Sequence, residues 1–185
     1  MRYIFDFDDV LFNTEKFKEH EFACMKKIGI SHEIALHSYE KIREAGKLFS
    51  LKYFLSDLFV VAEIKGIEIE EIYEDIMGVC KTLLNKEVFQ LIQKLGRENC
   101  FIVTHGDREF QMDKIKRTGI VPLFSEIVIV PGSKKEMVEK ICAKYKNEEV
   151  FFIDDKEKYF EDLDLKKCPN LKTILYSDSL LYLQQ

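Results

Sequence analysis

The chain has 185 residues, of which 46% are apolar and 33% are charged, a composition typical of one globular domain with room for an insertion. Its formal net charge is −5 with no basic tract, and no apolar run approaches the roughly 18 residues of a membrane span, so we expect no nucleic acid and no membrane among its partners. Five scattered cysteines without a CxxC pair, and no leader pattern after Met1, favour a cytoplasmic protein, which we expect to be a monomer or a weak homodimer.

The first predicted element is a short buried strand, Arg2–Phe5, which consists mostly of apolar residues. Two acids follow it, Asp6 and Asp8, with a single residue between them. Open α/β sheets build their sites at the carboxyl ends of the strands, because several strand ends meet there. The first strand is therefore predicted to deliver two carboxylates to a functional site.

Residues 14–84 contain no convincing strand, and their apolar periodicity predicts about four helices. The predicted helices span residues 15–28, 31–45, 48–64 and 68–84. A purely helical block inserted after the first strand is expected to form a separate lobe over the carboxyl edge of the sheet. The predicted domains are accordingly a core of residues 1–13 and 85–185 and a helical cap of residues 14–84.

In the rest of the chain, helical patterns alternate with short apolar runs. The runs predicted as strands are Cys100–Val103, Glu126–Val130, Val150–Ile153 and Lys172–Tyr176, and the predicted helices are 85–95, 108–117 and 134–145. Strands that are apolar without alternation and are separated by helices favour a parallel sheet covered on both faces. The predicted fold class is α/β, a three-layer, Rossmann-like parallel sheet with an inserted all-helical cap domain.

Residues capable of chemistry follow the predicted strands. They are Asp6 and Asp8 after the first strand, Thr104-His105-Gly106-Asp107 after the second, Lys134 and Lys135 after the third, and Asp154-Asp155 after the fourth. Asp6 can serve as a nucleophile, and Asp8 can donate or accept a proton. Carboxylates such as Asp6 and Asp154 suit Mg²⁺, while Thr104 and a lysine can hold phosphate oxygens. Convergence of these residues on one edge of the sheet predicts a site for phosphoryl transfer.

At these positions the chain resembles the haloacid dehalogenase superfamily of phosphohydrolases. Four segments carry the resemblance, in order and across nearly the whole chain, and the helical block between the first two matches the position of the family's type 1 cap. The first segment is similar to the family's DxDx(T/V)L motif. The segments are Asp6-Phe-Asp8-Asp9-Val10-Leu11, Ile102-Val-Thr104, Lys134-Lys135-Glu136-Met137 and Phe151-Phe-Ile153-Asp154-Asp155.

The resemblance implies a Mg²⁺-dependent phosphomonoesterase that hydrolyses a small phosphorylated metabolite through a phospho-aspartate. Asp6 would be the nucleophile and Asp8 the general acid and base. The implied metal ligands are Asp6, the main-chain carbonyl of Asp8, Asp154 and, directly or through water, Asp155, and the implied phosphate contacts are Thr104 and Lys134, with His105 as a further candidate. The true dehalogenases of the family keep no aspartate at the position of Asp8 and use no Mg²⁺, so Asp8 argues against dehalogenation.

Several positions depart from the family pattern or leave alternatives open. Asp9 stands where glycine is usual, which indicates a tighter turn or a left-handed backbone. Asn13-Thr14 replaces a common Asp-Ser pair, and Tyr159 stands where an amide or acid often steadies the metal site. Lys135 competes with Lys134 for the phosphate. In the cap, Arg43, Lys47 and Lys52 are candidate substrate contacts.

Two other functions are compatible with the same motifs. A phosphotransferase or mutase would pass the phosphoryl group to an acceptor other than water. A regulatory module would bind phosphate without useful turnover, although a module that only binds has no need of a general acid such as Asp8. Hydrolysis of a small phosphorylated substrate is the function that we expect.

Overall fold

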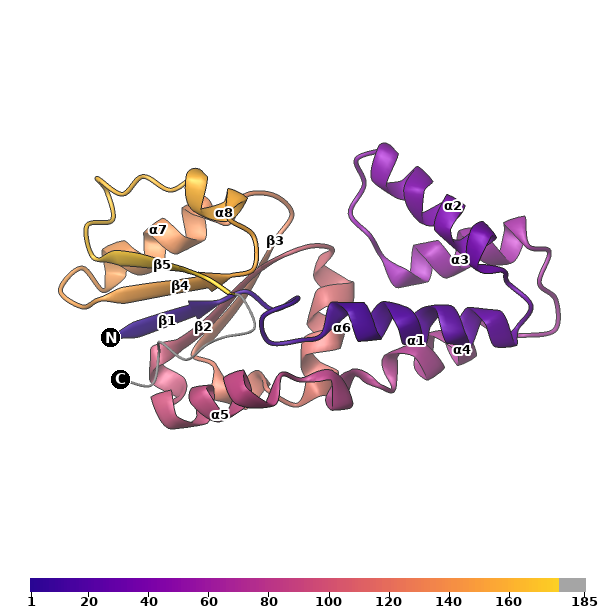
Figure 1. Ribbon diagram of the computed structural model, residues 1–185, viewed down its shortest axis with the longest axis horizontal. Helices are drawn as coiled ribbons and strands as arrows, with labels where there is room; N and C mark the ends of the chain where they lie inside the picture. Colours follow the sequence, from indigo (N-terminus) through magenta and orange to yellow (C-terminus); the bar gives the residue numbers. More distant parts are fainter. Residues whose placement is uncertain (177–185) are drawn as a thin grey trace.

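The computed structural model describes residues 1–176, and it places five parallel strands in one sheet (Figure 1). The spatial order of the strands is β3-β2-β1-β4-β5. Their bounds are Arg2–Phe5 for β1, Cys100–His105 for β2, Glu126–Val130 for β3, Val150–Asp154 for β4 and Leu171–Leu175 for β5. The predicted parallel α/β fold is confirmed, while residues 177–185 of the predicted core lie outside the described part of the chain.

Two strands are longer than their apolar character predicted, because polar residues continue the ladders. Thr104 and His105 extend β2 by pairing with Ile129 and Val130 of β3. Asp154 extends β4 in the same way, opposite Leu175 of β5. These extensions hold three chemistry-bearing residues on the backbone of the sheet itself, at its carboxyl edge.

Different helices cover the two faces of the sheet. The helices are α5 (Lys86–Leu95), α6 (Arg108–Thr118), α7 (Lys135–Lys144) and α8 (Lys158–Glu161). Tyr3 and Phe5 of β1 belong to a buried cluster with apolar residues of α5 and α6, whereas Ile4 belongs to a second cluster with α7 and α8. Successive side chains of a strand point to opposite faces, so this division gives the predicted three layers.

Four α-helices and a short 3-10 helix follow β1 before α5 begins, and Figure 1 shows the α-helices to one side of the sheet. Within residues 14–84 the helices are α1 (Thr14–Lys27), α2 (His32–Glu44), α3 (Leu51–Val61), α4 (Ile69–Met77) and the 3-10 helix Cys80–Leu83. The helix predicted over residues 68–84 is divided, since α4 ends before Gly78 and a 3-10 helix follows. Glycine is a poor helix former, which accounts for the break.

The two chain segments that enter and leave this helical group lie against each other. The backbone N–H of Asn13 donates to the carbonyl of Leu83 at 2.9 Å, and the N–H of Asn85 donates to the carbonyl of Leu11 at 2.8 Å. Phe12 forms an antiparallel bridge with Leu84. The two chain segments that connect the helical group to the sheet therefore run side by side and are hydrogen-bonded to each other.

Two further observations concern the cysteines and the apolar character of the helices. All five cysteines, Cys24, Cys80, Cys100, Cys142 and Cys168, are free and buried. Within residues 1–176, no helix combines the length and apolar character needed to cross a membrane.

Candidate active site

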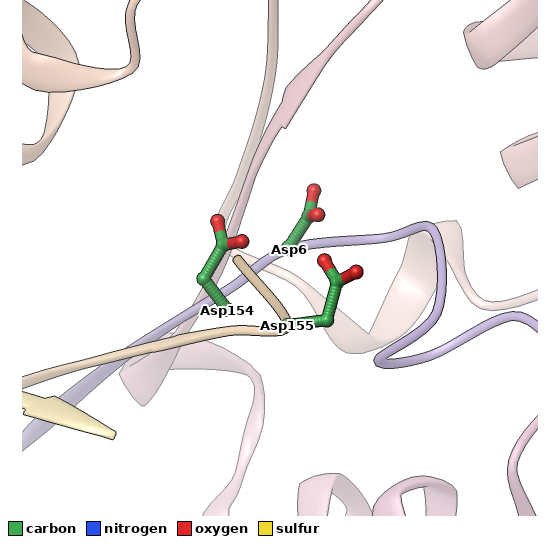
Figure 2. Close-up of side chains that lie close together, drawn as sticks. All are labelled: Asp6, Asp154 and Asp155. Atoms are coloured by element: carbon green, nitrogen blue, oxygen red, sulfur yellow. The ribbon is translucent and has the colours of Figure 1, made fainter. Parts of the chain in front are cut away.

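Three carboxylates meet at the carboxyl edge of the sheet. Asp6 follows β1, Asp154 ends β4 and Asp155 comes next, and Figure 2 shows their side chains close together, extending to the same side of the backbone. One oxygen from each lies within 4.8 Å of the others. Asp6 and Asp154 are buried, and this burial, together with their mutual repulsion, raises the pKa of Asp6 above its ordinary value. A cluster of this kind needs positive charge to neutralise it.

Lys134 supplies one such charge. Its side chain is only 1% exposed, and Nζ lies 2.8 Å from Asp6 Oδ1 and 2.6 Å from Asp154 Oδ2. Lys135 is 43% exposed and lies 3.9 Å from Glu139 on the surface of α7. Of the two lysines left open by the sequence, Lys134 is the one in the site.

Tyr159, one of the positions that departs from the family pattern, packs against this lysine. The Nζ atom of Lys134 lies 4.2 Å from the centre of the Tyr159 ring, a distance suited to a cation–π contact. Burial raises the pKa of Tyr159 to about 12, so the phenol stays neutral. The Tyr159 ring therefore stabilises Lys134, at a position where the family pattern often has an amide or acid beside the metal site.

The acidic cluster also fits a divalent cation. Its donors are carboxylate oxygens, the hard ligands that Mg²⁺ prefers. Asp155 Oδ1 is buried, and no hydrogen-bond partner for it lies among residues 1–176. Asp155 Oδ2 and Asp154 Oδ1 are bound by Lys156, through its Nζ at 2.8 Å and its backbone N–H at 2.9 Å. A buried oxygen without a partner, facing two further carboxylates, is what a cation ligand requires.

Asp8 belongs to a different cluster. Lys114 Nζ lies 2.6 Å from Asp8 Oδ1, Gln111 Nε2 donates to Oδ2 at 2.5 Å, and Thr14 Oγ1 donates to Oδ1 at 3.1 Å. Burial alone would raise the pKa of Asp8, but the Lys114 ammonium and these hydrogen bonds outweigh it and hold that pKa below its ordinary value. The Asp8 side chain thus lies outside the acidic cluster, and only its main-chain carbonyl remains as the predicted metal ligand.

Sequence reasoning missed Lys114 and Gln111. Both lie on the buried side of α6, which Asp107 begins by accepting a hydrogen bond from the N–H of Phe110. Lys114 is four residues from Phe110 and therefore shares its face of the helix. The four-residue spacing from Phe110, which places Lys114 on the same face of the predicted helix as an aromatic residue, was the signal that could have found it.

The turn after β1 explains two departures from the family pattern. Asp9 has a φ of 60°, which confirms the left-handed backbone expected for a residue in the place of glycine. Its Oδ1 accepts a hydrogen bond from the N–H of Thr14 at 3.2 Å. Asn13 caps α1 by accepting from the N–H of Lys16 at 2.8 Å, which leaves the Thr14 hydroxyl for Asp8.

Thr104 and His105 lie at the end of β2, beside the two carboxylate clusters. The hydroxyl of Thr104 is buried without a hydrogen-bond partner among residues 1–176, so it is available to a ligand. Burial lowers the pKa of His105, and the nearby Lys134 lowers it further, which favours a neutral imidazole. Both residues line the same cavity as Asp6 and Asp8.

This cavity has a volume of about 400 Å³ and lies between the sheet edge and the helical group. Lys18 of α1, Arg43 of α2 and Lys47 beyond it line its far wall. Lys52, the third candidate contact from residues 14–84, instead lies 3.4 Å from Glu70 and does not line this cavity. Of the three candidate contacts, Arg43 and Lys47 therefore line the cavity and Lys52 does not.

Comparison with known proteins agrees with this arrangement. A family model described as haloacid dehalogenase-like hydrolase matches residues 2–158. The chain therefore belongs to the haloacid dehalogenase-like hydrolase family. No curated protein sequence gives a match.

Solved structures share the fold at low sequence identity. A protein assigned as a haloacid dehalogenase-like hydrolase from Burkholderia xenovorans LB400 matches with a TM-score of 0.71 and 17% identity, over 92% of this chain and 79% of that one. One assigned as a β-phosphoglucomutase from Thermotoga maritima has a TM-score of 0.59 and 19% identity, over 96% and 87%. The L-2-haloacid dehalogenase from Xanthobacter autotrophicus has a TM-score of 0.52 and 11% identity, over 93% and 75%. Because these proteins differ in chemistry, their fold alone does not define the reaction of this chain.

Proposed function

We propose that the protein is a Mg²⁺-dependent phosphomonoesterase that hydrolyses a small phosphorylated metabolite by way of phospho-Asp6. The observation that carries the proposal is that Asp6 and Asp8 line one cavity while belonging to separate clusters. Asp6 lies with Lys134 and two further acids, and Asp8 lies among hydrogen-bond donors. The two carboxylates have different partners and different positions in one cavity, so they can take two different roles in one reaction.

In the first step, the Asp6 carboxylate attacks phosphorus and the ester P–O bond breaks. The leaving oxygen takes a proton from Asp8. Because Lys114 holds the pKa of Asp8 below its ordinary value in the protein alone, this step needs the anionic phosphate beside Asp8 to favour the protonated carboxyl group. Lys134 reduces the repulsion between the anionic nucleophile and the anionic phosphate, and the free hydroxyl of Thr104 offers a donor to a phosphate oxygen. His105 lines the cavity as a further candidate for this contact.

In the second step, water attacks phospho-Asp6 and gives its proton to the Asp8 carboxylate. The P–O bond to Asp6 breaks, inorganic phosphate leaves, and both aspartates return to their starting states. A divalent cation held by Asp6, Asp154 and Asp155, together with the main-chain carbonyl of Asp8, would supply further charge neutralisation for both transfers. The same Asp8 serves as the acid in the first step and as the base in the second, so it regains its proton at the end of the cycle.

The proposed cap, residues 14–84, favours a substrate with negative charge beyond the phosphate. Lys18, Arg43 and Lys47 line the cavity, and none of them forms an ion pair among residues 1–176. Glu21 is the acid of α1 on this wall, and burial raises its pKa to about 8, so it is neutral at neutral pH. A small phosphorylated acid is the substrate class that fits this wall.

Steady-state hydrolysis of para-nitrophenyl phosphate and of a panel of phosphorylated acids, with and without Mg²⁺, tests the proposal. We expect Mg²⁺-dependent release of phosphate and loss of activity in Asp6→Asn. Isotopically labelled water separates hydrolysis from transfer, because only hydrolysis brings solvent oxygen into the released phosphate. Full activity of Asp6→Asn, or binding without turnover across the panel, would contradict the proposal.

A further inference from the structure

A buried lysine lies directly behind the proposed general acid. The side chain of Lys114 is 3% exposed, and its Nζ atom lies 2.6 Å from Asp8 Oδ1. Lysine is almost never buried unless it is paired, because desolvation of an ammonium group is costly. The presence of this buried ammonium group beside the cavity therefore indicates a functional role for its contact with Asp8.

Aromatic rings surround the ammonium group on its other sides. Ring centres lie 4.9 Å (Phe110), 5.2 Å (Phe12), 5.4 Å (Phe7) and 5.9 Å (Phe17) from Lys114 Nζ. Rings at these distances stabilise a cation. Among residues 1–176, Asp8 is the only carboxylate within ion-pair distance of Lys114 Nζ. The ammonium group of Lys114 therefore donates its hydrogen bond to the carboxylate of Asp8.

The carboxylate of Asp8 is thereby held from two elements at once. Lys114 and Gln111 reach it from α6, and Thr14 reaches it from the first residue of α1. Gln111 approaches closely because residue 106 is glycine, where an added Cβ would lie 2.8 Å from Gln111 Cγ. Both carboxylate oxygens have fixed partners, so the side chain has a single defined orientation at the cavity wall.

We propose that Lys114 is a positioning residue that sets the location of the Asp8 carboxyl group for proton transfer to the leaving oxygen. This inference rests on the proposed function. Proton transfer needs hydrogen-bond reach between the acid and the leaving oxygen, so a shift of about 1 Å in Asp8 impairs it severely. Because Phe17 and Thr14 belong to α1, the position of Asp8 also depends on how α1 packs against α6.

The dependence of the rate on the leaving group distinguishes this role from a merely structural one. An aryl phosphate such as para-nitrophenyl phosphate releases a stable anion and needs little protonation, whereas an alkyl phosphate needs it strongly. For Lys114→Met we expect kcat/KM to fall roughly 100-fold with an alkyl phosphate and less than about tenfold with the aryl phosphate. Lys116→Met, an exposed lysine on the same helix, is the matched control and should change neither.

A double-mutant cycle gives the second readout. In an Asp8→Asn background, Lys114→Met should cause no further loss with either substrate, because the group it positions is already absent. If Lys114→Met does not fold, Gln111→Met, which removes the donor to Asp8 Oδ2, should show the same dependence on the leaving group.

Each outcome is decisive. Equal losses with both substrates, or additive losses in the Asp8→Asn background, would overturn the positioning role while leaving the phosphatase proposal intact. Lack of hydrolysis of either substrate by the wild-type protein would instead overturn the proposed function.

Discussion

The ammonium group of Lys134 lies 2.8 Å from the carboxylate of Asp6, and both side chains are buried. Lys134 also reaches Asp154 at 2.6 Å, so a single cation pairs with two buried acids. Removal of one partner from a buried ion pair leaves an uncompensated charge, which costs more than the pair itself contributes. This contact therefore links the stability of the site to its chemistry.

Replacement of Lys134 should affect both properties. We expect Lys134→Met to lower kcat/KM by at least about 100-fold and to destabilise the protein by roughly 3–5 kcal/mol in the absence of metal. The adjacent Lys135→Met is the control, because Lys135 is 43% exposed and, within the described residues 1–176, pairs only with Glu139. Kinetics and urea unfolding measure the two effects, and equal behaviour of the two variants would contradict the assignment of Lys134.

Metal binding should depend on pH through Asp6. Burial raises the pKa of Asp6, so the native state holds a proton that the unfolded chain releases, and stability without metal falls as the pH rises through that interval. A cation that replaces this proton binds more tightly at higher pH. Thermal unfolding should therefore show a larger rise in Tm with Mg²⁺ at mildly alkaline pH than at mildly acidic pH. An equal rise at both values, or an unchanged response in Asp154→Asn, would count against the acidic cluster as the metal site.

Glu21 should contribute a separate pH dependence. Burial raises its pKa from 4.5 to about 8, so stability falls as the pH rises between these values and levels off above them. Glu21→Gln keeps the shape without the titration, and the variant should gain in Tm relative to the wild type as the pH rises. Glu19→Gln, an exposed position on the same helix, provides the control. A difference in Tm that does not change with pH would contradict the buried, neutral state of Glu21.

The basic wall of the cavity should govern substrate choice. We expect Arg43→Ala and Lys47→Ala each to raise KM about tenfold for phosphorylated acids, a change that corresponds to roughly 1.4 kcal/mol, and to leave para-nitrophenyl phosphate within about twofold. Lys52→Ala is matched to them because Lys52 pairs with Glu70 outside this cavity. The same rise in KM for phosphorylated acids and for para-nitrophenyl phosphate would rule out a specific role for the wall.

Much of the fold was predictable because the strands are buried on both faces and their apolar runs are short and unbroken. The ends of β2 and β4 were not, since Thr104, His105 and Asp154 are polar and continue their strands through backbone pairing with neighbours far away in the sequence. Local composition contains no information about such pairing. The convergence of Asp6 and Asp154 was predictable, because the carboxyl ends of parallel strands lie at the same edge of a sheet.

The environment of Asp8 was the part of the site that the sequence did not reveal. Its partners Thr14, Gln111 and Lys114 lie 6, 103 and 106 residues away, and their approach depends on the packing of α1 against α6. The choice between Lys134 and Lys135 likewise needed the structure, because adjacent residues at a helix start differ only in the direction of their side chains. Helix packing, not residue type, decides both questions.

Direct detection of a phosphoryl group on Asp6 tests the central claim. Rapid quenching of the enzyme during turnover of para-nitrophenyl phosphate, followed by peptide mass spectrometry, should show one added phosphoryl group on the peptide that contains Asp6. Asp8→Asn should still form this species when the aryl phosphate is used, and it should retain it for longer, because the base for the second step is missing. Turnover by the wild-type enzyme with no phosphoryl group on Asp6, together with unchanged activity of Asp6→Asn, would contradict the account.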